Sequence, residues 1–268
     1  MAYAKINGVT NANMAKIGNV AKAGFGKISG QSAPVSFTDT YSIDLDGNDD
    51  HMDTGLVMYN RNVTISAWLK QDAGSYDEAW GGDMSGDRTK ILGLSTFFSG
   101  GLRFYVGDGS SSYIFNVTSG VNIADGNWHN VIVTIGGDDE NDNTVDLSVW
   151  VNGVQKYDVD NHDLGMDAAQ FTFGMGYRHP GCGCGSFNGK IGDTAVWQDQ
   201  FTTAEAVAVY NSGTPFNLTA NSSDYTSSSA LVGYWKYEEN TGTSVADSST
   251  NSNNGTLSNG ASFIEDTP

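Results

Sequence analysis

Short apolar runs separated by Gly, Asp and Asn recur along most of this chain, with hardly any proline between them. Each run is rich in β-branched or aromatic residues, which favour strands, and each is bounded by residues that favour turns. The runs occupy residues 41–45, 63–69, 90–94, 102–106, 113–117, 129–135, 145–151, 171–174 and 192–197. Strands at this spacing, without helices between them, predict an all-β fold of two antiparallel sheets packed as a sandwich.

Two local patterns support this prediction. In residues 63–69 the apolar side chains alternate up to Trp68, as in a strand with one face toward a core. Trp68, Trp128, Trp150 and Trp197 are assigned to the core on the same grounds. Asn152-Gly153 between two apolar runs is the strongest short-range signal for a hairpin with a type I′ turn.

The last third of the chain is expected to contain one short helix and a further strand. Residues 203–210 favour helix, with Thr202 or Thr203 as the cap and Gly213 as the stop signal. Residues 217–229 are rich in Ser, Thr, Asn and Asp, which predicts a surface loop. The apolar residues 231–237 then predict a strand.

The first 34 residues carry an 11-residue repeat in which a Lys-Ile pair returns three times. These six residues are Lys5, Ile6, Lys16, Ile17, Lys27 and Ile28. With one Ile per repeat among Ala, Gly and Asn, the segment has too little apolar surface to fold alone. We therefore expect residues 1–34 to form an extended anchoring arm that binds a partner through these residues, and residues 35–268 to form one domain.

Charge divides the chain at the same place. Residues 1–34 hold four lysines and no acid, whereas residues 35–268 hold 9 basic and 31 acidic side chains, so the two parts carry net charges of +4 and −22. A basic tail on an acidic body predicts docking to an acidic protein surface or to a sister subunit. Nucleic acid is not expected as a partner, because four separated lysines give few phosphate contacts and the body repels the phosphate backbone.

Other signals set limits on location and metal chemistry. No run of 18 apolar residues exists, so no membrane span is expected, and the first residues lack the apolar stretch of an export signal, which predicts assembly in a cytoplasm. His179, Cys182 and Cys184 could supply three zinc ligands, but a structural site needs four. A glycine-rich loop with two free thiols is the alternative explanation of these residues.

Several motifs, taken in order, resemble the concanavalin A-like jelly roll of the laminin G-like superfamily. They are the opening strand and acidic turn of residues 41–50, the Thr-Ile-Ser-Ala-Trp strand of residues 64–68, the Gly-Asn-Trp-His strand of residues 126–131, the Val-Asn-Gly hairpin of residues 149–153, and residues 187–197 with the helix that follows. The resemblance covers most of residues 41–213 and implies a jelly-roll sandwich. Residues 231–257 resemble a segment that many relatives carry at the start of the domain, so the order looks circularly permuted, which is inexpensive when both termini meet at a sheet edge.

The permuted order and the repeated N-terminal arm together resemble virion proteins of tailed phages of aquatic bacteria. This resemblance implies a non-enzymatic virion protein, assembled in the host cytoplasm. Its arm would dock on capsid or tail, and its lectin-like domain would serve as decoration or host-surface adhesin. We expect a homo-oligomer. The alternative is a free calcium-dependent lectin that binds carbohydrate.

Catalysis is not expected, because a fold of this kind can also carry glycosidase activity but the required residues are missing. Jelly-roll glycosidases use two carboxylates in a Glu-x-Asp-x-x-Glu arrangement on one strand, and none of the six glutamates has this spacing. The four histidines are scattered, without a nucleophile or metalloprotease signature.

Two kinds of site are nominated. Resemblance to calcium-carrying relatives implies a calcium site formed by Asp46, Asp193, Asp247 and Asn251; the alternative is that these residues cap turns. A carbohydrate surface needs exposed aromatic side chains with polar neighbours, which two loops offer through Trp80, Tyr177, Arg178 and His179.

Overall fold

The computed structural model describes residues 37–72, 77–82, 92–97, 99–108, 111–137, 144–165, 168–176 and 185–268, together with six two-residue strands before them. By internal contacts the chain divides into two compact units, Met1–Thr38 and Asp39–Pro268. The first unit contains one antiparallel pair for each 11-residue repeat. These pairs join β1 (Lys5–Ile6) to β2 (Val9–Thr10), β3 (Lys16–Ile17) to β4 (Val20–Ala21), and β5 (Lys27–Ile28) to β6 (Gln31–Ser32). Each repeat thus forms the same local pair, whereas the sequence predicted an extended arm.

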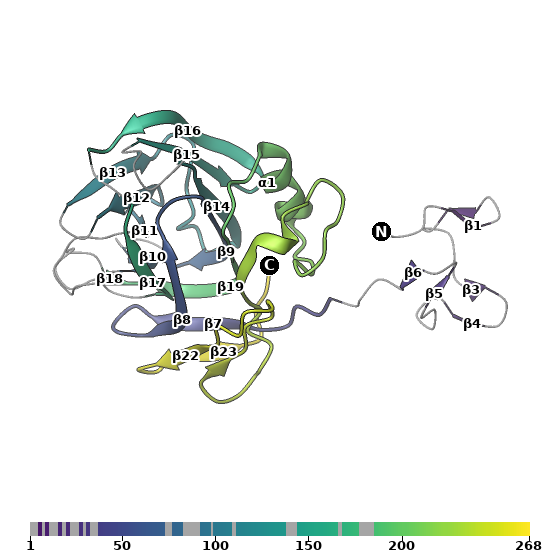
Figure 1. The fold of residues 1–268 in the computed structure, drawn as a ribbon. Helices are drawn as coiled ribbons and strands as arrows, with labels where there is room; N and C mark the ends of the chain where they lie inside the picture. The colour runs from purple at the N-terminus through teal and green to yellow at the C-terminus, as the bar shows by residue number, and fades with distance from the viewer. Residues whose placement is uncertain are drawn as a thin grey trace. The chain divides into compact units, whose positions relative to one another are not determined.

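The second unit is a sandwich of two sheets, as predicted (Figure 1). The nine-stranded sheet has the order β13-β12-β11-β10-β17-β8-β22-β21, with β18 beside β10. Its strands are β8 (His51–Tyr59), β10 (Asp77–Gly82), β11 (Leu92–Thr96), β12 (Leu102–Gly107), β13 (Ser112–Val117), β17 (Gln170–Met175), β18 (Gly185–Ser186), β21 (Ser244–Val245) and β22 (Gly255–Ser258). All pairs in this sheet are antiparallel except β10 with β18.

The eight-stranded sheet has the order β16-β15-β14-β9-β19-β7-β23, with β20 beside β19. Its strands are β7 (Ser42–Asp46), β9 (Val63–Gln71), β14 (His129–Ile135), β15 (Thr144–Val151), β16 (Val154–Asp163), β19 (Asn188–Trp197), β20 (Leu231–Trp235) and β23 (Ser262–Ile264). The β15–β16 turn has φ values of 52° at Asn152 and 71° at Gly153, which confirms the predicted type I′ hairpin.

Facing side chains of the two sheets form the core. On β9 the predicted residues Val63, Ile65, Ala67 and Leu69 all point into it. The strand β8, which the sequence did not predict, alternates strictly between buried and more exposed positions. It was missed because Asp53 and Gly55 occupy its outward positions and weaken the apolar signal.

The segment after β19 covers the outer face of the eight-stranded sheet. Helix α1 (Thr203–Tyr210) packs there: the rings of Trp68 and Tyr210 lie 6.0 Å apart. Trp197 contacts Phe201 in the same way, at 4.7 Å. Trp68, Trp150 and Trp197 are buried as predicted, but Trp128 is only half-buried and lies just before β14.

Helix α1 begins as predicted and ends earlier than predicted. Thr202 and Glu205 form a capping box, in which each side chain accepts a hydrogen bond from the other's backbone N–H. The helix ends at Asn211, whose φ of 48° is left-handed, so it stops before Gly213. None of the helices in the described part of the chain is long and apolar enough to cross a membrane.

The C-terminal strands close both sheets beside the N-terminal ones. Strand β22 pairs with β8, and β23 pairs with β7. Both ends of the domain therefore meet at neighbouring strands, which is the geometry that a circularly permuted order requires.

Candidate metal centre

The turn between β7 and β8 gathers three carboxylates from the sequence Asp46-Gly47-Asn48-Asp49-Asp50. Gly47 has a φ of 79°, and a Cβ there would lie 2.8 Å from Cβ of Asn188, so only glycine fits. Asp46 accepts hydrogen bonds from the backbone N–H and the side-chain amide of Asn48, at 2.8 and 2.9 Å. Asp50 in turn accepts the backbone N–H of Asp46 at 3.0 Å. The turn therefore folds around its own acidic side chains.

Oxygen atoms of Asp46, Asp49 and Asp50 lie within 4.8 Å of one another. Asp50 is only 3% exposed, and its Oδ1 has no hydrogen-bond partner. Burial, and then the negative charges of Asp46, Asp49 and Asp44, raise the pKa of Asp50, although its bond from the Asp46 N–H opposes the shift. The hydrogen bonds from Asn48 lower the pKa of Asp46. A buried carboxylate oxygen thus faces two further carboxylates.

Segments distant in sequence hold this turn in place. Ser186 donates to the Asn48 carbonyl at 2.9 Å, and the Asn259 amide donates to the Asp49 carbonyl at 3.0 Å. Within the described residues, none of the three carboxylates forms an ion pair with lysine or arginine. A hard cation such as Ca²⁺ prefers clustered carboxylate oxygens, and it would supply the positive charge that the protein does not. The residues present therefore fit calcium.

Calcium at this turn has a measurable consequence for stability. At a calcium concentration 100 times Kd, binding to the folded state adds about 2.7 kcal/mol, which for a domain of this size corresponds to a Tm increase of about 5–10 °C. We expect Asp50→Asn to abolish this increase in a thermal melt with calcium and with chelator. Asp160→Asn, which removes one exposed carboxylate from β16, should retain it. An equal increase in the Asp50 variant would rule out this turn as the site.

The four residues predicted as one calcium site are not brought together. Asp46 pairs with Asn188 across β7 and β19, and Asp193 lies five residues further along β19, roughly 16 Å away at the rise of a strand. Strand β20 separates Asp193 from Asp247, because Trp235 pairs with Thr194 on one side and with Asp247 on the other. The predicted set is therefore wrong, and only Asp46 belongs to the cluster found in the described residues.

Asp247 and Asn251 lie close to each other but act as loop caps. The Asp247 carboxylate accepts the backbone N–H groups of Tyr234, Ser249 and Asn253, each at 2.8 Å, and the Ser249 hydroxyl at 2.7 Å. The Asn251 amide donates to the Leu231 carbonyl at 3.1 Å. Turn capping, the alternative to calcium binding, thus describes these two residues.

Asp193 is a buried carboxyl group inside the fold. Its side chain accepts one hydrogen bond, from the Tyr234 hydroxyl at 3.1 Å, and its Oδ2 has no partner. A cavity of only about 10 Å³ lies beside it, lined in part by Ser66 and Trp68. Burial, followed by repulsion from Asp39, raises the pKa of Asp193 well above its usual value. The cavity is too small for a ligand beyond a water molecule.

The carbohydrate nomination is wrong at one position. Trp80 is fully buried, with its ring 5.7 Å from Phe104 and 6.2 Å from Phe173. Its position on β10 turns it into the core, so it offers no exposed ring. Tyr177, Arg178 and His179 lie outside the described residues, as do Cys182 and Cys184.

Sequence reasoning missed Asp49 and Asp50. Two consecutive acids directly after a Gly-Asn turn, at the end of a predicted strand, were the available signal. What the sequence lacked was the position of Ser186 and Asn259, which hold the turn from distant parts of the chain.

A two-sheet antiparallel sandwich with an acidic turn at a strand end defines a lectin-like β-sandwich domain. The Laminin_G_3 family model, described as the concanavalin A-like lectin/glucanases superfamily, matches residues 46–208. This match covers more than half of the chain, and the chain belongs to that family.

Solved structures agree with this fold. A putative carbohydrate binding protein from Bacteroides ovatus superposes with a TM-score of 0.58 at 18% identity, over 91% of this chain and 66% of that chain. A SAP-like pentraxin from Limulus polyphemus gives a TM-score of 0.48 at 18% identity, over 64% of this chain and 82% of that chain. The CBM40 domain of a Ruminococcus gnavus sialidase, bound to α2,3-sialyllactose, gives 0.43 at 13% identity, over 63% and 95%. No curated protein sequence matches this chain significantly.

Proposed function

We propose that this protein is a non-enzymatic phage virion component that displays a lectin-like domain from a particle surface. In this proposal the N-terminal repeats dock on a capsid or tail protein during assembly in the host cytoplasm, copies associate with one another, and the sandwich serves as decoration or as host-surface adhesin. The observation that carries the proposal is the 11-residue Lys-Ile repeat with a net charge of +4 on a body of −22.

The repeats suit docking through several equivalent contacts. Lys5, Lys16 and Lys27 begin strands of the same length, each paired with the two residues that follow the turn. Three equivalent contacts joined in one chain bind more tightly than any single one, because the second and third contacts form intramolecularly. An acidic partner surface would attract the arm and repel the body, so the body would project outward.

Deletion of residues 1–34 tests this proposal. We expect the truncated chain to retain the Tm of the full chain, because the sandwich begins at Asp39 as a separate unit, and to disappear from purified particles. Incorporation is measured by mass spectrometry of particles assembled in the presence of tagged full-length or truncated protein. The triple variant Lys5→Gln, Lys16→Gln and Lys27→Gln separates charge from the rest of the arm. Incorporation of the truncated chain at the normal level would refute the anchoring role.

The absence of catalysis in this proposal is supported by the roles of the described glutamates. Glu205 closes the capping box, and Glu238 accepts the backbone N–H groups of Thr40 and Tyr41 at 2.7 and 3.1 Å. Glu239 accepts the N–H of Ala246, and Glu265 accepts the hydroxyl of Tyr41. These acids hold the fold, and none is paired with a second carboxylate across a cleft as glycosidases require.

A free calcium-dependent lectin is the second candidate, favoured by the acidic turn of Asp46, Asp49 and Asp50. A glycan array run with calcium and with chelator distinguishes the two. Glycan binding that chelator abolishes, by a protein that is absent from particles, would favour the lectin.

A further inference from the structure

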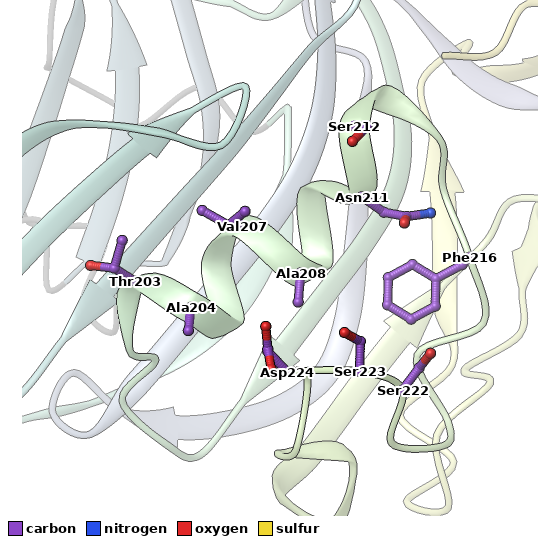
Figure 2. Close-up of a pocket in the computed structure, with 10 residues that line it drawn as sticks. All are labelled: Thr203, Ala204, Val207, Ala208, Asn211, Ser212, Phe216, Ser222, Ser223 and Asp224. Carbon is purple, nitrogen blue, oxygen red and sulfur yellow. The ribbon is translucent and has the colours of Figure 1, made fainter. Parts of the chain in front are cut away.

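A pocket of about 630 Å³ lies on the outer face of the eight-stranded sheet, far along the fold from the acidic turn. One wall is helix α1 with the 3₁₀ turn Asn211–Gly213 that follows it, and the other is the tight turn at Ser222–Tyr225. Figure 2 shows the ring of Phe216 beside Asn211 and facing the second turn, with Ala204 and Ala208 pointing from the helix toward Asp224. The volume lies in the range of small-molecule sites.

The two walls are tied to each other by hydrogen bonds. Glu205 of the helix accepts the hydroxyls of Thr226 and Ser227 at 2.9 and 2.7 Å, directly after the second turn. Tyr225 anchors that turn below the surface: its hydroxyl donates to the Leu218 carbonyl at 2.7 Å and accepts the Trp197 indole N–H at 2.9 Å. The pocket therefore exists before any ligand arrives, which lowers the entropy cost of binding.

Three non-glycine residues that line this pocket have left-handed backbones. The φ values are 48° at Asn211, 57° at Ser212 and 52° at Ser223. For serine this conformation is uncommon, and such residues concentrate at ligand sites because the surrounding structure must maintain them.

The chemistry of the lining selects a class of ligand. The half-buried ring of Phe216 and the methyl groups of Ala204 and Ala208 form an apolar surface, and polar groups of Asn211, Ser222 and Ser223 border it. The exposed Asp224 carboxylate has no hydrogen-bond partner in the described structure, so it is available to accept from vicinal hydroxyls. No lysine, arginine or histidine lines the pocket, which together with the −22 body excludes an anionic ligand.

We infer that this pocket binds a neutral sugar, with one face of the pyranose ring on Phe216 and hydroxyl groups donating to Asp224. Sugars combine an apolar ring face with hydroxyls at its edge, and this pocket offers an aromatic ring beside a free carboxylate. The inference rests on the carbohydrate binding proposed above and gives it a place. Because the acidic turn contributes no lining residue, binding here is independent of calcium.

The test uses the full chain in buffer containing chelator, with lactose, maltose, mannobiose and diacetylchitobiose as neutral probes. Saturation-transfer NMR and titration calorimetry measure binding, and 3′-sialyllactose and methylamine serve as anionic and cationic probes. We expect at least one neutral disaccharide to bind. Asp224→Asn, which keeps the shape of the side chain, and Ala204→Gln, which fills the groove from an exposed helix position, should each weaken this binding at least about tenfold, or about 1.4 kcal/mol. Asp160→Asn is the control with the same change of charge, and it should bind as the wild type does.

Each other outcome contradicts the inference in a distinguishable way. Sugar binding that both pocket variants retain at an unchanged Tm would place the site elsewhere and leave the proposed carbohydrate binding standing. Absence of binding to all neutral probes would overturn both. Binding of methylamine or sialyllactose in place of the neutral sugars would overturn the ligand class.

Discussion

Replacing Asp247 by alanine is expected to lower the free energy of unfolding by about 2–4 kcal/mol. The substitution leaves the N–H groups of Tyr234, Ser249 and Asn253 without their acceptor, and each buried donor without a partner costs about 1–3 kcal/mol, less where water reaches it. Asp247 also holds the loop between β21 and β22 against β20, so its loss exposes the closing strands of the sandwich.

Urea denaturation measures this effect, and calcium separates the two roles considered for Asp247. If Asp247 only caps the loop, the loss is the same in calcium and in chelator. Asp247→Asn keeps one acceptor oxygen and places an NH₂ group against the remaining donors, so its effect should be intermediate. Asp160→Ala is the exposed control, for which we expect a change below about 0.5 kcal/mol. An effect of Asp247→Ala that chelator removes would restore it as a calcium ligand.

Asp193→Asn is expected to stabilise the protein at pH 8 by about 1–3 kcal/mol and to leave its stability at pH 4 nearly unchanged. The carboxylate is buried, with one oxygen lacking a partner, and an amide of the same shape carries no charge to desolvate. Asparagine also tolerates the positive φ of 21° at this position. A substitution that stabilises through a buried position is unusual, which makes the sign of the effect informative.

The direction with pH follows from which state binds more protons. Burial raises the pKa of Asp193 well above 3.8, and burial together with Glu238 raises the pKa of Asp39 to about 7. Above pH 4 the unfolded chain has released protons that the folded protein still holds, so stability falls as pH rises from about 4 through 7. Lys236 opposes the shift at Asp193 without reversing it, and the Tyr234 hydroxyl does the same.

Melting curves between pH 4 and pH 8 check this prediction. The wild type should lose stability with rising pH across this range, and Asp193→Asn should flatten the decline. Asp39→Asn should flatten it below pH 7. The exposed variant Asp160→Asn should follow the wild type. A wild type that gains stability from pH 4 to pH 8, or a destabilised Asp193→Asn at pH 8, would show that this carboxyl group is charged and well compensated.

Local elements were predictable wherever the determining residues are neighbours in the chain. The Asn152-Gly153 hairpin, the alternation in β9 and the cap at Thr202 depend on a few consecutive residues, and the structure contains all three. The end of α1 was misjudged because Asn211 adopts the left-handed conformation expected of Gly213. Resemblance of ordered motifs predicted the sandwich, and the family match and superposition agree with it.

The sites were less predictable. Trp80 was assigned to an exposed loop and lies in the core, because pairing with β11 and β17 turns its side chain inward. Of the four predicted calcium residues, only Asp46 lies in the acidic cluster, beside Asp49 and Asp50. The pocket of Phe216 and Asp224 gave no recognisable motif, since its walls come from a helix and a turn that meet through Glu205.

The sequence by itself determined where strands, turns and the capped helix form, and it placed the division between a basic repeat and an acidic body, because these properties depend on residues close together in the chain. Only the tertiary structure decided which acids meet at the β7–β8 turn, which carboxyl group is buried at Asp193, and which side chains border a pocket. Burial and charge interactions depend on distances through space, and those are set when strands far apart in the chain pair with each other.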